Sequence, residues 1–154
     1  MRDFNDADRT KKKRRIQLPE NPGNLSEEAL GRLEGAVRAA AREGYLACPA
    51  GWKIAADQGV SRLDVGAMMD RLGLRVTDCQ LGFFQVDKTP YAGEGREPAG
   101  EELARRVAEL DERGELTCSS VFALARELGV KPRTVADAAN AGGHKIRQCQ
   151  LGCF

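Results

Sequence analysis

The side chains best suited to chemistry in this chain are its cysteines. Five occur, two pairs at equivalent places in the two halves of the chain and one extra near the carboxyl end: Cys48, Cys79, Cys118, Cys149 and Cys153. Four thiolates are the ligand set of a tetrahedral zinc site or an iron–sulfur cluster. The spacing suits neither, because Cys48 lies far from Cys79 and no C-x-x-C pair is present. We therefore expect buried cysteines that pack a helix against a strand, without a cofactor; zinc, an iron–sulfur cluster or a redox-responsive regulator is the less favoured alternative.

Two further patterns bear on metal binding and catalysis. His144, the only histidine, lies shortly before Cys149, but Leu74 stands at the equivalent position of the first half, which favours a packing or surface role for the imidazole. The chain has no G-x-S-x-G sequence, no glycine-rich phosphate loop and no nucleophile and base at informative spacing. The sequence therefore predicts a protein that is not an enzyme.

A repeated hexapeptide reveals how the chain is organised. CQLGFF at 79–84 recurs as CQLGCF at 149–154, and a single gapless alignment pairs 33–84 with 103–154. Of the 52 aligned positions 15 are identical, which indicates an internal duplication. We expect a basic, disordered tail over 1–24, a first repeat over 25–84, a linker over 85–100 and a second repeat over 101–154.

Each repeat is expected to contain three helices. An i, i+3, i+4 apolar stripe marks the first, the second spans CPAGWKIAADQ or CSSVFALAREL, and the third spans RLDVGAMMDRL or PRTVADAANAG. One spacing recurs across the second and third helices: Ala55, Gly59 and Val65, then Ala125, Gly129 and Val135. This spacing resembles the helix-turn-helix of DNA-binding proteins, over about residues 51–72 and 121–142. The resemblance implies close helix contact at Ala, a strained turn at Gly and a core position at Val.

The residues after each third helix complete the predicted fold. LRVTDCQLGFF and HKIRQCQLGCF contain β-branched residues and alternate locally, so we expect a strand with a bend near Asp78, where the alternation changes phase. A strand after three helices is similar to the start of a winged helix. The predicted fold is mainly α, with two tandem three-helix helix-turn-helix units, each followed by a short β-strand in a winged-helix-like arrangement.

Charge distinguishes the two repeats. Residues 128–154 carry four basic side chains and one acidic one, whereas the matching 58–84 carry three of each. Phosphate contacts supply most non-specific affinity for DNA, so the second repeat is the better candidate for a DNA-facing surface. The candidate base-reading residues are Arg133, Thr134 and Asn140, the candidate phosphate contacts are Lys131, Lys145 and Arg147, and Arg62 is a candidate in the first repeat.

These features predict a protein that binds duplex DNA and regulates transcription, led by the second repeat. The alternative is a non-enzymatic interaction module that uses the helix-turn-helix as a scaffold and binds a protein partner through the first repeat. Met68 and Met69 would mark that contact surface if they were exposed, but we expect them to pack in the core or between the repeats. The chain has no apolar stretch long enough for a membrane span and no secretory signal, so we expect a cytoplasmic protein outside the membrane.

Overall fold

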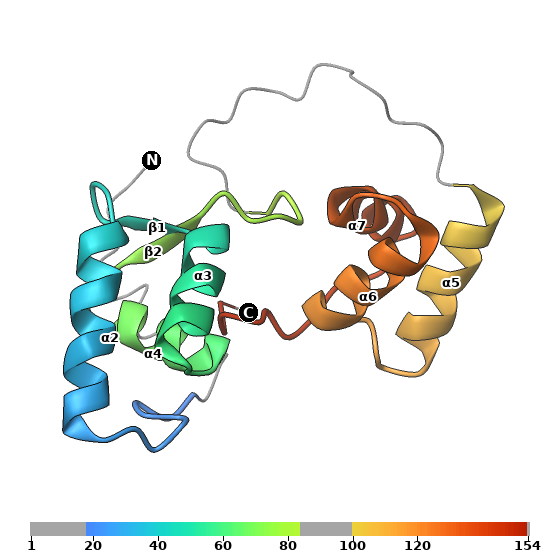
Figure 1. Ribbon diagram of the computed structural model, residues 1–154. Helices are drawn as coiled ribbons and strands as arrows, with labels where there is room; N and C mark the ends of the chain where they lie inside the picture. The colour runs from blue at the N-terminus through green and yellow to red at the C-terminus, as the bar shows by residue number, and fades with distance from the viewer. Residues whose placement is uncertain (1–17, 84–99, 154) are drawn as a thin grey trace. The chain divides into compact units, whose positions relative to one another are not determined.

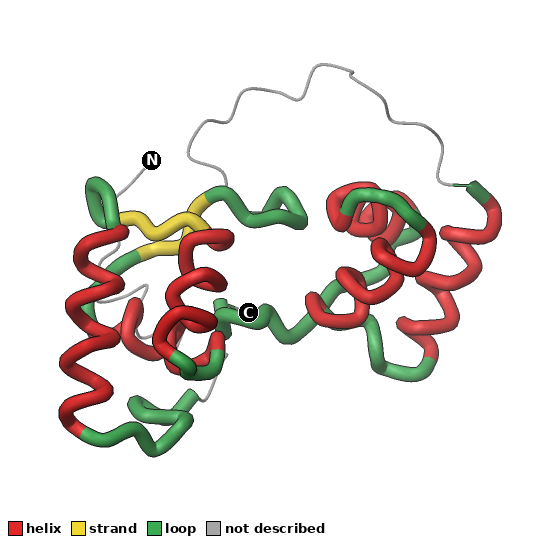
Figure 2. Tube along the Cα trace, in the orientation of Figure 1, coloured by secondary structure: helices red, strands yellow, loops and turns green. Residues whose placement is uncertain are grey.

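The computed structural model describes residues 18–83 and 100–153 and divides the chain into two compact units. The described residues are mainly helical, as predicted, and contain six helices and one pair of short strands (Figure 1, Figure 2). Most of the predicted tail, 1–17, and most of the predicted linker, 85–99, lie outside the described residues, as does Phe84 of the predicted first repeat.

Unit 1 contains the three helices expected of the first repeat. Its elements are α2 (Glu27–Ala40), β1 (Tyr45–Ala47), α3 (Cys48–Gln58), α4 (Arg62–Arg71) and β2 (Arg75–Thr77). Helix α2 begins after Ser26, whose side chain accepts a hydrogen bond from the Ala29 amide, and it ends at Ala40. Helix α3 stops at Gly59, which has a φ of 65°. Glycine adopts this left-handed conformation at little cost, so the turn between α3 and α4 occurs where the spacing predicted it.

The strand after the third helix has a different partner from the one a wing would supply. β2 pairs in parallel with β1, the segment just before α3, with Leu46 opposite Val76. An antiparallel wing hairpin is absent from the described part of unit 1. β2 covers only 75–77, because the chain turns at Asp78, where φ is 50°. The predicted bend is therefore confirmed, and the hexapeptide lies beyond the strand.

Unit 2 repeats this arrangement with less regular strand structure. Its helices are α5 (Glu101–Glu112), α6 (Cys118–Leu128) and α7 (Pro132–Ala141). Thr117 and Ser120 form a reciprocal capping box at the start of α6, and Gly129 ends that helix with a φ of 66°. A parallel bridge joins Thr117 to Arg147, at the positions that match the Ala47 and Thr77 pair of unit 1.

The two hexapeptides are exchanged between the repeats. Unit 1 comprises 1–79 together with 150–154, and unit 2 comprises 80–149, so the division differs from the predicted boundaries at 84 and 154. Leu81 is buried in unit 2 and Leu151 in unit 1, at 3% and 1% exposure. The left-handed residues Asp78 and Gln148 stand immediately before the hexapeptides and redirect the chain at equivalent points.

Candidate nucleic-acid interface

Helix α7 has one buried face and one open face. Its apolar side chains pack into unit 2, and Val135 is fully buried. Asp137 and Asn140 are exposed on the opposite side. This separation follows the 3.6-residue period of the helix, because alanines and one valine repeat on one side and polar residues on the other. The third helix of the second repeat therefore presents a polar face to solvent.

Helix α4, the equivalent helix of unit 1, has no comparable face. Every residue from Asp64 to Met69 is buried. Part of the cover comes from the segment before α2, where the Gly23 amide donates a hydrogen bond to Asp64 Oδ1 at 2.7 Å. Met68 and Met69 are 2% and 3% exposed, so they pack in the core as expected and do not form a contact surface.

Three candidate phosphate contacts are exposed in unit 2. Lys131 is the residue before α7, and Lys145 and Arg147 follow its end. The backbone of Arg147 is held at both ends of the parallel bridge, since its amide donates to the Leu116 carbonyl and its carbonyl accepts from the Cys118 amide, each at 3.0 Å. Ile146 between the two cations is buried, so their side chains leave the same side of an extended segment, as the sequence predicted.

The three candidate base-reading residues of the second repeat differ in their exposure to solvent. Asn140 is exposed, whereas Arg133 and Thr134 are only half-buried. Arg133 Nε lies 3.8 Å from Asp137 Oδ2, one turn further along α7. The same guanidinium lies against Gly82 of the first hexapeptide, which belongs to unit 2. Asn140 is thus the base-reading candidate with the most open position, and Arg133 is held against its own unit.

Arg62, the candidate in the first repeat, is engaged within unit 1. Its guanidinium stacks over the Trp52 ring, 3.6 Å from the centroid, and donates a hydrogen bond to the Gln150 side chain. A guanidinium on an aromatic face gains from the ring quadrupole and leaves its edges able to donate. Arg62 therefore holds Gln150 against unit 1.

The cysteines are divided between the units. Cys48 and Cys118 are buried at the first positions of α3 and α6, whereas Cys79, Cys149 and Cys153 are half-buried. Within residues 18–83 and 100–153, no group of three or more His, Cys, Asp or Glu side chains is arranged to hold a metal ion. His144 Nδ1 lies 2.8 Å from Asp111 Oδ2, so the imidazole links the segment after α7 to α5.

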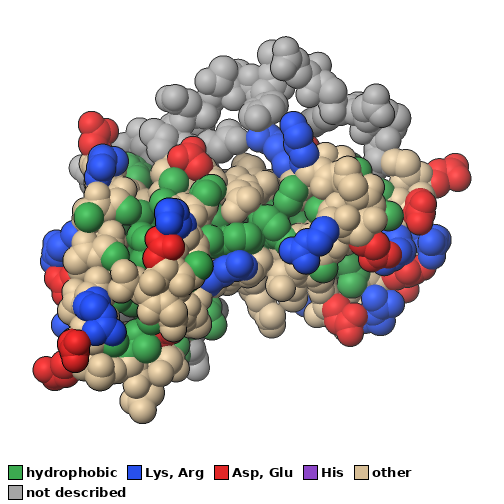
Figure 3. Space-filling view, in the orientation of Figure 1, with side chains coloured by type: hydrophobic (Ala, Val, Ile, Leu, Met, Phe, Trp, Pro, Cys, Tyr) green, Lys and Arg blue, Asp and Glu red, His purple; other side chains and the backbone are tan. Residues whose placement is uncertain are grey.

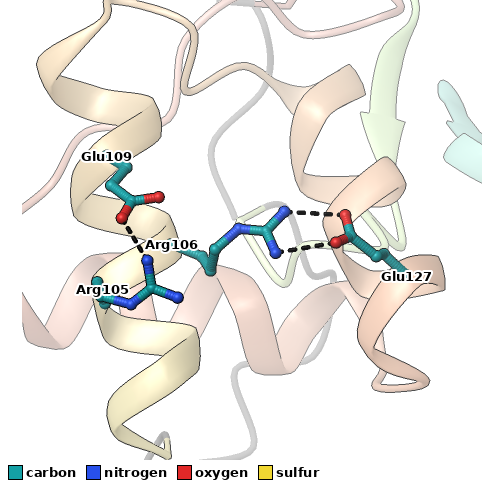
Figure 4. Close-up of polar contacts among 4 residues, drawn as sticks. All are labelled: Arg105, Arg106, Glu109 and Glu127. Carbon is teal, nitrogen blue, oxygen red and sulfur yellow. Dashed lines mark hydrogen bonds and ion pairs between the residues drawn. The ribbon is translucent and has the colours of Figure 1, made fainter.

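Two polar contacts are important in the structure but were not singled out from the sequence. Asp64 is 4% exposed, and its Oδ2 accepts hydrogen bonds from the Ser61 amide and hydroxyl at 2.9 and 2.6 Å. The S-x-x-D spacing is a helix-start pattern that could have identified it. In unit 2, Arg106 forms a two-pronged salt bridge with Glu127, each N–O distance 2.9 Å (Figure 4). No sequence signal marks this pair, because its members lie on different helices, far apart along the chain.

The Arg106–Glu127 salt bridge shifts the pKa of both residues in the directions expected of an ion pair. The hydrogen bonds and charge of Arg106 lower the pKa of Glu127, and Glu127 raises the pKa of Arg106. The neighbouring Arg105 pairs instead with Glu109 along α5, at 2.5 Å (Figure 4). Cations of the α5 side are therefore paired with carboxylates, and Figure 3 shows the mixture of acidic and basic side chains there.

Comparison with protein-family models, with curated proteins and with solved structures finds no match to this chain. Among the described helices, each is too short or too polar to cross a lipid bilayer. Any function must therefore be argued from the residues and contacts above.

Proposed function

We propose that the protein binds duplex DNA through unit 2 and acts in transcriptional regulation, with its two repeats serving as a tandem pair of helix-turn-helix units. The observation that carries this proposal is the open polar face of α7 with exposed cations beyond both of its ends, Lys131 before it and Lys145 and Arg147 after it. In this proposal unit 1 is a structural unit, because its third helix is covered.

Dimensions support this use of α7. A helix of 10 residues is about 15 Å long, and the major groove of B-DNA is about 12 Å wide. Lys131 precedes this helix in the sequence, and Lys145 and Arg147 follow it, so exposed cations flank it on both sides along the chain. Asn140, exposed on the outer face, has the amide that pairs with the N6 and N7 edge of adenine.

The charge distribution of unit 2 also supports binding with α7 toward the DNA. Residues 128–149 carry four basic and one acidic side chain, a net charge of +3, whereas 100–127 carry four basic and seven acidic ones, a net charge of −3. The repeat is therefore neutral as a whole but polarised, and the segment that contains α7 is the positive end. A phosphate backbone attracts that end and repels the α5 end, which orients the encounter.

The protein-interaction alternative has lost the surface on which it was based. It required an exposed apolar patch around Met68 and Met69, and both side chains are buried. Met68 and Met69 therefore offer no surface to a protein partner.

Fluorescence anisotropy of a labelled random-sequence duplex, titrated with the protein at several salt concentrations, tests the proposal. We expect log affinity to fall linearly with log salt. Lys131→Ala and Lys145→Ala should each weaken binding and reduce the salt slope by about 1. Lys53→Ala, an exposed cation of unit 1 paired with Asp57, is the matched control and should leave both quantities unchanged. Absence of binding at low salt, or equal effects of all three variants, would overturn the proposal.

A further inference from the structure

The last described residues of the chain fill a groove in unit 1. Leu151 is 1% exposed, and its side chain lies against Gly51, which the Leu46 side chain also approaches. The Leu151 carbonyl oxygen comes so close to Gly66 of α4 that a Cβ at this position would overlap it. Gly66 lies within the regular helix α4, so no turn requires a glycine there. Its lack of a side chain instead allows the Leu151 backbone to approach the helix closely. Two glycines thus form the floor on which the Leu151 backbone and side chain rest.

The residues on either side of Leu151 are also held by specific contacts. Gln150 accepts a hydrogen bond from the guanidinium of Arg62, which Trp52 positions by stacking. Gly152 is buried with a φ of 69°, and a Cβ there would overlap the Leu18 side chain. Each residue of the Gln-Leu-Gly segment therefore has its own partner. Gln150 is bonded by Arg62, Leu151 packs against Gly51 and Gly66, and Gly152 lies where Leu18 leaves no room for a side chain.

The corresponding groove of unit 2 is built from different residues. Val121 and Ala136 stand where unit 1 has Gly51 and Gly66. Leu81 is nevertheless buried there. The close backbone approach to a glycine is therefore a property of the unit 1 groove and is not required by the duplicated fold.

We propose that this groove of unit 1 is a peptide-binding site selective for a Gln-Leu-Gly segment, and that a second copy of this chain can supply the segment. The contacts described above hold residues 150–152 to unit 1, yet the segment reaches it from the second repeat through the turn at Gln148. An identical segment from another molecule can make the same contacts, which is the condition for exchange between copies. This inference is independent of nucleic-acid binding.

A molecule's own segment competes with the segment of a second molecule for the groove, and the experiment must remove this competition. A tethered segment competes at an effective concentration on the order of millimolar, so the wild-type chain is expected to fill its own groove. Exchange between molecules becomes measurable when one molecule has a defective segment and the other has a defective groove.

Two full-length variants provide these defects. Gly66→Ala blocks the groove and leaves the segment intact, whereas Leu151→Ala weakens the segment and leaves the groove intact. We expect each variant alone to be monomeric in size-exclusion chromatography with light scattering. The mixture should contain a dimer of one molecule of each, because the intact segment enters the intact groove. A monomeric mixture of two folded variants, judged by circular dichroism, would overturn the proposal.

A peptide titration gives an independent measurement and decides the matter if Gly66→Ala fails to fold. The probe is a fluorescent peptide of residues 147–154, added to the Leu151→Ala protein. We expect saturable binding, weakened at least about tenfold when Leu151 of the peptide is also replaced by Ala. Gly31→Ala, at an exposed glycine with open space around it, is introduced into the Leu151→Ala protein as a control and should not change the affinity. Failure of the peptide to bind overturns the proposal.

Discussion

Replacing Leu151 by Ala tests which unit the end of the chain stabilises. The chain has a single tryptophan, Trp52, and it lies in unit 1 beside Arg62. Its fluorescence therefore reports on unit 1, whereas far-ultraviolet circular dichroism reports on the helices of both units. If residues 150–153 stabilise unit 1, the substitution must change the tryptophan signal even though it lies in the second repeat by sequence.

The magnitude follows from the burial of the side chain. Leu151 is 1% exposed, and replacing a buried leucine by alanine costs about 2–5 kcal/mol. Leu151 lies in a turn outside the helices, where the surroundings can relax more easily than in a helix interior, so we expect the lower part of this range, about 2–3 kcal/mol. With an m-value of about 1–3 kcal/mol per M, the urea midpoint of unit 1 should fall by about 0.7–3 M.

Leu81→Ala is the matched control, since it removes the same atoms from the equivalent position in the other hexapeptide. Leu81 is 3% exposed and packs in unit 2. Its replacement should therefore lower the urea midpoint measured by circular dichroism and leave the midpoint measured by Trp52 fluorescence unchanged. Amide hydrogen exchange can localise the effects, which we expect in α4 for Leu151→Ala and in α7 for Leu81→Ala.

The opposite pattern would refute the exchanged arrangement. If each hexapeptide packed in its own repeat, Leu81→Ala would destabilise the tryptophan-containing unit and Leu151→Ala would not. Equal shifts of the Trp52 transition by both variants would refute the assumption that the two units respond separately.

Two further predictions test single polar contacts. Asp64→Ala removes the acceptor of the Ser61 and Gly23 hydrogen bonds, and unit 1 should lose about 1–3 kcal/mol in urea unfolding followed by Trp52 fluorescence. Thr134→Ala, at the matching position of unit 2, should leave that transition unchanged. The second concerns Glu127, whose pKa is lowered by Arg106, so the folded carboxyl binds its proton less readily than the unfolded one. The resulting stabilisation is present above the ordinary pKa of 4.5 and is lost as the pH falls through the folded pKa. Thermal unfolding of wild type and Glu127→Gln, followed by circular dichroism, should therefore differ at about pH 7 and converge toward about pH 3; a difference that grows on acidification would contradict this sign.

Local signals were sufficient to place most helices. The stretches beginning at Cys48 and Cys118 were predicted as helices and form α3 and α6 with the same bounds, because Gly59 and Gly129 stop them in left-handed conformations. Pro132 begins α7 as expected, since the first turn does not need its missing amide hydrogen. α2 ends at Ala40, because the chain then turns back between Arg42 and Tyr45 and begins the parallel strand pair.

Local sequence patterns predicted the positions of only some residues of the candidate site. The exposed positions of Lys145 and Arg147 followed from strand alternation around a buried Ile146, which is a local pattern. The positions of Arg133 and Arg62 did not follow from any local pattern, because each is set by a hexapeptide distant in sequence: Gly82 lies against Arg133, and Gln150 accepts from Arg62.

The sequence by itself determined the duplication, the helical character of each repeat and the turns at its glycines, because these depend on residues within a few positions of one another. Only the tertiary structure decided which repeat each hexapeptide stabilises and which third helix stays open. Both repeats end in nearly the same hexapeptide, so local preference cannot distinguish their destinations. The choice depends on packing: Gly51 and Gly66 admit Leu151 against α4, and this contact, with the Gly23 segment, buries α4 while α7 keeps a face in solvent.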